Sequence, residues 1–94
     1  MASERKIREF DTGRLLATPG VLERVAREDL LMGYLRHISC DWGDLSPEDR
    51  RANNRALAEG GRLLSAYHDR SGRKFWIITE ADRSATTLLL PDEY

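Results

Sequence analysis

The charged segment near the end of the chain is the first place where the residue types could do chemistry. Glu80 and Asp82 are two residues apart, so in an extended strand their side chains would project from one face. Two carboxylates placed in this way could hold Mg²⁺, and Arg83 could steady a phosphate beside the ion. The segment offers few further oxygen ligands, and Asp and Ser side chains commonly bond the backbone of turns. We therefore interpret Glu80–Ser84 first as a turn, second as a recognition edge and third as a catalytic site.

The loop DWGD is the second candidate. Trp42 lies between Asp41 and Asp44, and Gly43 can adopt a positive φ angle. A tryptophan often anchors a protein–protein interface, but it also serves as a cover over a small core, which is the interpretation that we favour for Trp42. Both interpretations stay open, and Asp41, Trp42 and Asp44 join Glu80, Asp82 and Arg83 as candidate binding residues.

The spacing His37-x-x-Cys40 suggests a zinc site or a cysteine nucleophile. Zinc takes about four ligands, and His68 is the only other histidine, with no second cysteine. A reactive thiolate needs an electropositive setting, whereas Cys40 is followed by Asp41. We expect a histidine at a helix end, a small half-buried thiol, and neither a metal nor a cofactor.

Size and composition restrict the class of protein. The chain has 94 residues, 40% of them hydrophobic and 33% charged, with a net charge of −1. This composition is typical of a globular protein, and no apolar run approaches the ~18 residues of a membrane helix. The first ten residues, MASERKIREF, lack the apolar core of a secretory signal. The single cysteine fits a reducing compartment, so we expect a cytoplasmic location and no membrane partner.

The charges are unevenly distributed along the chain. Acidic residues dominate positions 41–49, and basic residues dominate the segment Arg50–Arg73. Such neighbouring blocks suit a protein-binding surface or a solvated helix. Nucleic-acid binding through Arg50–Arg73 is a weaker alternative that predicts steep salt dependence, and the slightly acidic chain argues against it.

The elements that must position these residues begin after a start, 1–9, that we expect to be flexible. A strand is expected over 14–17, followed by a helix with Thr18 as cap and Pro19 at its first position. A second helix is expected from a cap at Asp29 to about Ser39. The apolar residues of both helices recur at helical spacing, which predicts that they are buried: Val21, Leu22, Val25, Ala26, Leu30, Leu31, Tyr34, Leu35 and Ile38.

The third helix is expected to begin at Ser46-Pro47 and to stop at Gly60-Gly61, with a thin apolar stripe that places it on the surface. After Gly61 the pattern becomes strand-like in RLLSAYHD, KFWIIT and ATTLLL. Residues 10–94 are thus predicted to form a single α+β domain of order β-α-α-α-β-β-β, with the helices packed on one face of a small antiparallel sheet. The sequence leaves open which side of the sheet the first strand joins.

The chain resembles a family of small bacterial proteins encoded on plasmids and other mobile elements. The resemblance rests on GRLLATPG, RHISCDWGDL, GGRLLSAY and WIITEADRSATTLLLPDEY and spans about Phe10 to Tyr94. The family pattern has glycine where Cys40 stands here. The resemblance supplies no activity or catalytic residue, and the genomic setting implies roles in transfer, maintenance or anti-defence.

These observations favour a non-catalytic accessory protein that binds another protein, with inhibition of a host defence complex as one such role. A small metal- or nucleotide-dependent enzyme using Glu80, Asp82 and Arg83 is the alternative. Whether the chain also forms a homo-oligomer is left open.

Overall fold

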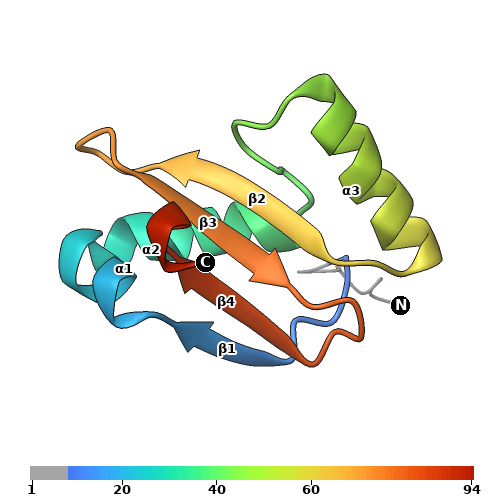
Figure 1. Ribbon diagram of the computed structural model, residues 1–94, viewed down its shortest axis with the longest axis horizontal. Coiled ribbons are helices and arrows are strands. Elements are labelled where there is room, and N and C mark those ends of the chain that lie inside the picture. The colour runs from blue at the N-terminus through green and yellow to red at the C-terminus, as the bar shows by residue number, and fades with distance from the viewer. Residues whose placement is uncertain (1–8) are drawn as a thin grey trace, which may run out of the picture.

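The computed structural model describes residues 9–94 and contains three α-helices, four strands and a short 3₁₀ helix (Figure 1). The elements are β1 (Arg14–Ala17), α1 (Pro19–Arg24), α2 (Arg27–Ile38), α3 (Pro47–Glu59), β2 (Leu63–His68), β3 (Lys74–Thr79), β4 (Ala85–Leu89) and η1 (Pro91–Glu93). This order confirms the predicted α+β class and the sequence β-α-α-α-β-β-β. The flexible start predicted for 1–9 lies outside the described residues except for Glu9, whose N–H donates to the carbonyl of Ile38.

The four strands form one sheet in the order β1-β4-β3-β2. The pairs β2–β3 and β3–β4 are antiparallel, as predicted, but β1 runs parallel to β4, with Leu15 beside Thr86. The sheet is therefore mixed rather than wholly antiparallel. The parallel pair is feasible because a long connection separates β1 from β4 and lets the chain cross back before it re-enters the sheet.

The hydrophobic core lies between one face of the sheet and the helices α1 and α2. In Figure 1, α2 lies behind the sheet and α1 lies past the end of β1. The core side chains from the strands alternate along each strand, as the pleat requires. The cluster consists of Val21, Val25, Leu30, Tyr67, Phe75, Ile77, Leu88 and Leu90. Helix α2 packs closely on the sheet at Gly33, where an added Cβ would lie 2.9 Å from the ring of Phe75.

The predicted helix starts are confirmed at two of three positions. The Thr18 and Ser46 side chains accept from the N–H groups of Val21 and Asp49 and cap α1 and α3. The cap predicted for α2 is wrong, because the helix begins at Arg27 and Asp29 lies within its first turn. The Asp29 carboxylate instead accepts from the backbone and side chain of Arg70.

Three leucines predicted to be buried are exposed. Leu22, Leu31 and Leu35 keep 54%, 57% and 42% of their surface open to solvent. Both helices carry two adjacent rows of apolar residues, and the small sheet covers only one row. The other row remains at the surface.

Helix α3 lies beyond the outer edge of β2 rather than on the face that α1 and α2 cover (Figure 1). Asn53 is its only buried residue, which confirms the predicted surface position. The short helix η1 turns the chain end over the opposite face of the sheet, where the ring of Tyr94 meets that of Trp76 at 5.9 Å. Within residues 9–94, no helix has the length and apolar character needed to cross a membrane.

Candidate functional site

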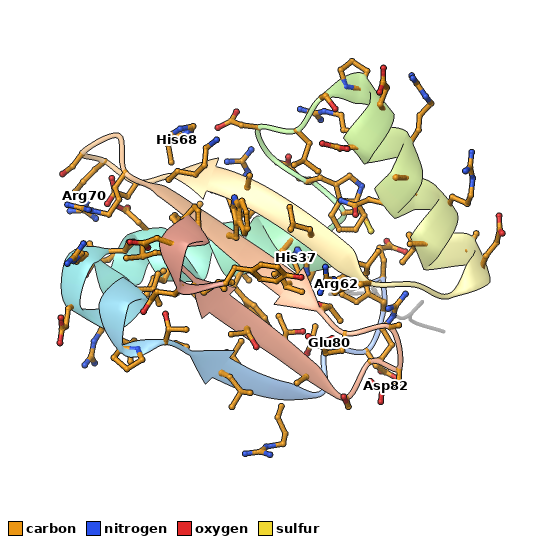
Figure 2. All side chains as sticks on the ribbon, in the orientation of Figure 1. His37, Arg62, His68, Arg70, Glu80 and Asp82 are labelled. Atoms are coloured by element: carbon orange, nitrogen blue, oxygen red, sulfur yellow. The ribbon has the colours of Figure 1, made fainter. Side chains whose placement is uncertain are left out.

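The segment Glu80–Ser84 joins β3 to β4, as the turn interpretation predicts, and Figure 2 shows Glu80 and Asp82 at this end of the sheet. The N–H of Glu80 donates to the carbonyl of Ala85, which closes the join. The Asp82 carboxylate accepts from the N–H of Ser84 at 3.0 Å, and hydrogen bonding to Ser84 lowers the pKa of Asp82. Asp82 is thus used within the turn, while Glu80 is exposed.

Arg83 directs its guanidinium inward from this join, toward backbone carbonyls. Its Nη1 donates to the carbonyl of Gly61 at 2.6 Å and to that of Glu80 at 3.0 Å, and its Nη2 donates to the carbonyl of Ala56 at 3.2 Å. Ala56 belongs to the last turn of α3, and its carbonyl also accepts from the N–H of Gly60 at 2.9 Å. Arg83 therefore connects the β3–β4 turn to the end of α3, and its guanidinium is already hydrogen-bonded within the protein.

The loop of Trp42 is fastened to the edge of β2. The N–H of Ala66 donates to the carbonyl of Trp42 at 3.1 Å, and the N–H of Asp44 donates to the carbonyl of Ala66 at 2.7 Å. Gly43 has a φ of 76°, and a Cβ there would meet the Ala66 carbonyl oxygen at 2.0 Å. The loop thus takes the place of a neighbouring strand and requires glycine to do so.

Trp42 itself is only 2% exposed. Its indole N–H donates to the side-chain oxygen of Asn54 at 3.0 Å, and its ring packs against Phe10 and His37. This environment agrees with a cover over the core and leaves little of the indole for direct contact with another protein.

The two acids that flank Trp42 each have a local partner. Asp41 forms a two-fold contact with Arg36, at 2.7 and 3.2 Å, and the Arg36 guanidinium lowers the pKa of that carboxyl. Asp44 lies 2.6 Å from Nδ1 of His68. Both carboxylates remain about half exposed, at 49% and 62%. A contact role for the six candidate binding residues stays a prediction.

A network of buried side-chain hydrogen bonds runs through the core and was not predicted. His37 is fully buried, with Nδ1 2.6 Å from Oγ of Ser65 and Nε2 2.9 Å from Oγ1 of Thr79. Thr79 in turn meets the hydroxyl of Thr86, which donates to the carbonyl of Thr12 at 2.8 Å. The only sequence signal was the placement of three hydroxyl residues on the inward faces of the three long strands.

In this network, the hydrogen bond from Thr86 to the carbonyl of Thr12 determines which atom donates in each of the others. Because the hydroxyl of Thr86 donates to a carbonyl, it accepts from Thr79, and Thr79 accepts from Nε2–H of His37. Ser65 then donates to Nδ1. The imidazole is neutral in this arrangement, and burial lowers the pKa of His37 to about 4. Both ring nitrogens form hydrogen bonds inside the core, so the role of His37 is structural.

The His37-x-x-Cys40 pair does not form a joint site. His37 lies in the core, whereas Cys40 follows the end of α2 with a φ of 63°, and burial raises the pKa of its thiol. A positive φ is a conformation that glycine adopts without strain. Within residues 9–94, no group of three or more His, Cys, Asp or Glu side chains is arranged to hold a metal ion.

The structure draws attention to a different part of the chain, the outer edge of β1. The N–H groups of Arg14 and Thr18 donate to the carbonyls of Ser84 and Leu88, so these residues face β4. Because successive residues of a strand alternate in direction, the backbone groups of Leu15 and Ala17 face outward. Among residues 9–94, no strand lies beyond this edge (Figure 1).

An apolar groove runs beside this edge, between β1 and the helices α1 and α2. Its volume is about 400 Å³. We call it the β1 groove; its lining is Leu15, Leu16, Ala17, Leu22, Arg27, Leu30, Leu31, Tyr34 and Leu88. Leu15, Leu22 and Leu31 are each more than half exposed within it. The doubled apolar rows of the two helices and the consecutive leucines of RLLA were the sequence signals for this surface.

Comparison of the chain with protein-family models, with curated proteins and with solved structures finds no match in any of the three.

Proposed function

We propose that this chain is a non-catalytic protein-binding module and that it binds an extended polypeptide segment at the β1 edge and the β1 groove. The observation that supports this proposal is that a free strand edge and an exposed apolar groove lie side by side. The backbone groups of Leu15 and Ala17 have no partner among residues 9–94, and they form the rim of an apolar groove in which Leu22 and Leu31 are exposed. An added strand satisfies the backbone groups, while its apolar side chains cover the leucines.

The difference between the two edges of the sheet supports this assignment. On the outer edge of β2, the backbone groups of Leu64 and Ala66 are bonded by Asn53, Trp42 and Asp44. Proteins commonly protect edge strands in this manner. Strand β1 has no comparable cover among the described residues. It carries two leucines, whereas a protected edge strand usually carries charged residues.

The alternative of an enzyme at Glu80, Asp82 and Arg83 has less support. The Asp82 carboxylate accepts from Ser84 within its turn. Arg83 donates to backbone carbonyls, so its guanidinium is not free to bind a phosphate in this conformation.

Nucleic-acid binding through Arg50–Arg73 also has less support. Arg62 precedes β2 and Arg70 follows it, so they lie at opposite ends of the strand (Figure 2). Arg70 is paired with Glu28 and Asp29, and Arg50 donates to the carbonyls of Gly43 and Leu45. These arginines do not form one continuous phosphate-binding surface.

The resemblance to mobile-element proteins adds a setting to the proposal. A cytoplasmic accessory protein that inhibits a host defence complex would need a protein-binding surface of this kind and no active site. The chemistry of the β1 groove favours a partner segment with apolar residues at alternate positions.

The test is selection from a displayed library of random peptides of ~12 residues, long enough to form one strand. The chain is immobilised sparsely, and enriched peptides are measured by fluorescence anisotropy against Leu31→Arg and Met32→Arg. Leu31 lines the groove and Met32 does not, although their exposures are nearly equal at 57% and 58%. We expect alternating apolar peptides that bind the wild type and Met32→Arg but lose at least tenfold in affinity for Leu31→Arg. The absence of any enrichment over the Leu31→Arg chain would contradict the proposal.

A further inference from the structure

We propose that the strand added at β1 is β1 of a second copy of this chain, in an antiparallel two-fold arrangement with Leu16 at the axis. This inference rests on the proposed function, because it names the polypeptide that occupies the β1 edge. Three features of β1 are self-complementary: its backbone register, its side-chain sizes and its charges.

The backbone register follows from which residues face outward. Leu15 and Ala17 present their N–H and C=O groups to the free edge, whereas Leu16 faces β4. When Leu16 lies on a two-fold axis, Leu15 of one copy is opposite Ala17 of the other, and the reverse pair forms on the other side of the axis. Both are pairs of the type that exchange two hydrogen bonds. Every outward group of β1 then has a partner, whereas pairing Leu15 with Leu15 or Ala17 with Ala17 shifts the strands and leaves some of these groups unpaired.

The side chains fit this register as well. Leu15 and Ala17 lie beside the buried Thr86 and Leu88 of β4, so their side chains project to the groove side of the sheet. Leu15 of the second copy therefore arrives beside Ala17. The small side chain of Ala17 leaves the groove open there, and Leu15 can reach toward Leu22 and Leu31 of the first copy. On the opposite side of the sheet the two copies of Leu16, each 40% exposed, face each other across the axis.

The charges are also complementary in this register. Arg14 is exposed at the start of β1 and falls opposite Thr18 of the second copy. The Thr18 hydroxyl donates to the carboxylate of Glu93, which also accepts from the N–H of Gly20. Arg14 of each copy is therefore directed to an acidic position of the other, and no two like charges lie directly opposite along the strand pair.

The first measurement is the mass in solution by light scattering after size exclusion, at chain concentrations of ~10–100 µM. This range covers the dissociation constants of weak interfaces of standard size. We expect twice the mass of one chain for the wild type and for Met32→Arg. Leu16→Arg places two cations at the axis without entering the core, and we expect it to have the mass of one chain with an unchanged circular dichroism spectrum. A wild type with the mass of one chain across this range overturns the inference.

The second measurement tests the register and does not depend on the folding of the arginine variant. Residues facing each other at a non-hydrogen-bonded position have Cα atoms ~4.5 Å apart, within the range of a disulfide. In a Cys40→Ser background, we expect Leu16→Cys to cross-link quantitatively on mild oxidation, at least tenfold faster than Met32→Cys. Equal rates for the two variants overturn the proposed axis.

The outcomes separate this inference from the proposed function. A chain that is monomeric but binds selected peptides in a Leu31-dependent manner retains the function and rejects the second copy as the occupant. A chain that is monomeric and selects no peptide rejects both.

Discussion

The side-chain amide of Asn53 occupies the position of a missing strand beside Leu64. Its Nδ2 donates to the Leu64 carbonyl at 2.6 Å, and its Oδ1 accepts from the Leu64 N–H at 3.2 Å. One amide side chain thus reproduces both bonds that a neighbouring strand would form, and it attaches α3 to the sheet.

Replacement of this amide provides the first prediction. Asn53→Ala leaves the N–H and C=O of Leu64 without these partners, which costs about 1–3 kcal/mol of unfolding free energy. Chemical denaturation measures the loss, with Arg51→Ala, an exposed change on the same helix, as a control expected to stay within about 0.5 kcal/mol of the wild type. Equal stability of the two variants would show that the Asn53 bonds contribute nothing to the fold.

The stability of the protein is expected to fall between about pH 6.5 and pH 4. The pKa of His37 is about 4 in the folded chain and 6.5 when unperturbed, so the unfolded chain binds more protons in this range. Acidification therefore favours unfolding, by roughly 3 kcal/mol once the folded pKa has been passed. Urea denaturation at a series of pH values measures the slope.

The matched controls for this slope are the two histidine variants. His37→Gln is expected to be less stable at neutral pH and to lose most of the slope above pH 5, whereas His68→Gln is expected to retain it. A wild type whose stability is constant between pH 6.5 and pH 4.5 would contradict the assignment of a neutral, buried His37.

Arg83 is expected to contribute stability through its side chain and to reduce it through its backbone. Its guanidinium bonds the carbonyls of Ala56, Gly61 and Glu80, but its φ of 62° lies in the region that favours glycine. Arg83→Ala removes the bonds and keeps the strained backbone, at a cost of about 2 kcal/mol. Arg83→Gly removes the bonds and relieves the strain, so it should be about 1 kcal/mol more stable than Arg83→Ala. Thermal denaturation of the two variants decides the matter, and the opposite order would refute the backbone contribution.

Cys40 offers a stabilising substitution. Because its φ is 63°, Cys40→Gly should raise the unfolding free energy by about 0.5–1 kcal/mol, after the greater flexibility of glycine in the unfolded chain is subtracted. Cys40→Ala retains the strain and should bring no such gain. If alanine stabilised the chain as much as glycine, the benefit would come from removal of the thiol and not from the backbone.

The features that could be predicted from the sequence were those that depend on nearby residues. Thr18-Pro19 and Ser46-Pro47 marked helix starts because a cap acts within one turn, and the period-two pattern after Gly61 identified the strands. Asp29 was misassigned as a cap because Asp is also favourable within the first turn, and its actual partner, Arg70, lies 41 residues away.

The features that were missed depend on contacts between distant residues. The parallel pairing of β1 with β4 requires knowledge of the whole connection between them. The partners of His37 are 28 and 42 residues away, so a local pattern showed only a histidine near a helix end. The exposure of Leu22, Leu31 and Leu35 depends on how much of each helix the sheet can cover, which helical spacing does not reveal.

The protected edge of β2 also sets a limit on growth. Fibrous assemblies extend because each added molecule exposes a fresh strand edge to the next one. In this chain the second edge is already bonded by the Trp42 loop and by Asn53 of α3. Association through β1 therefore stops once one partner strand has been added, and the exposed leucines can bind that partner without starting a fibre.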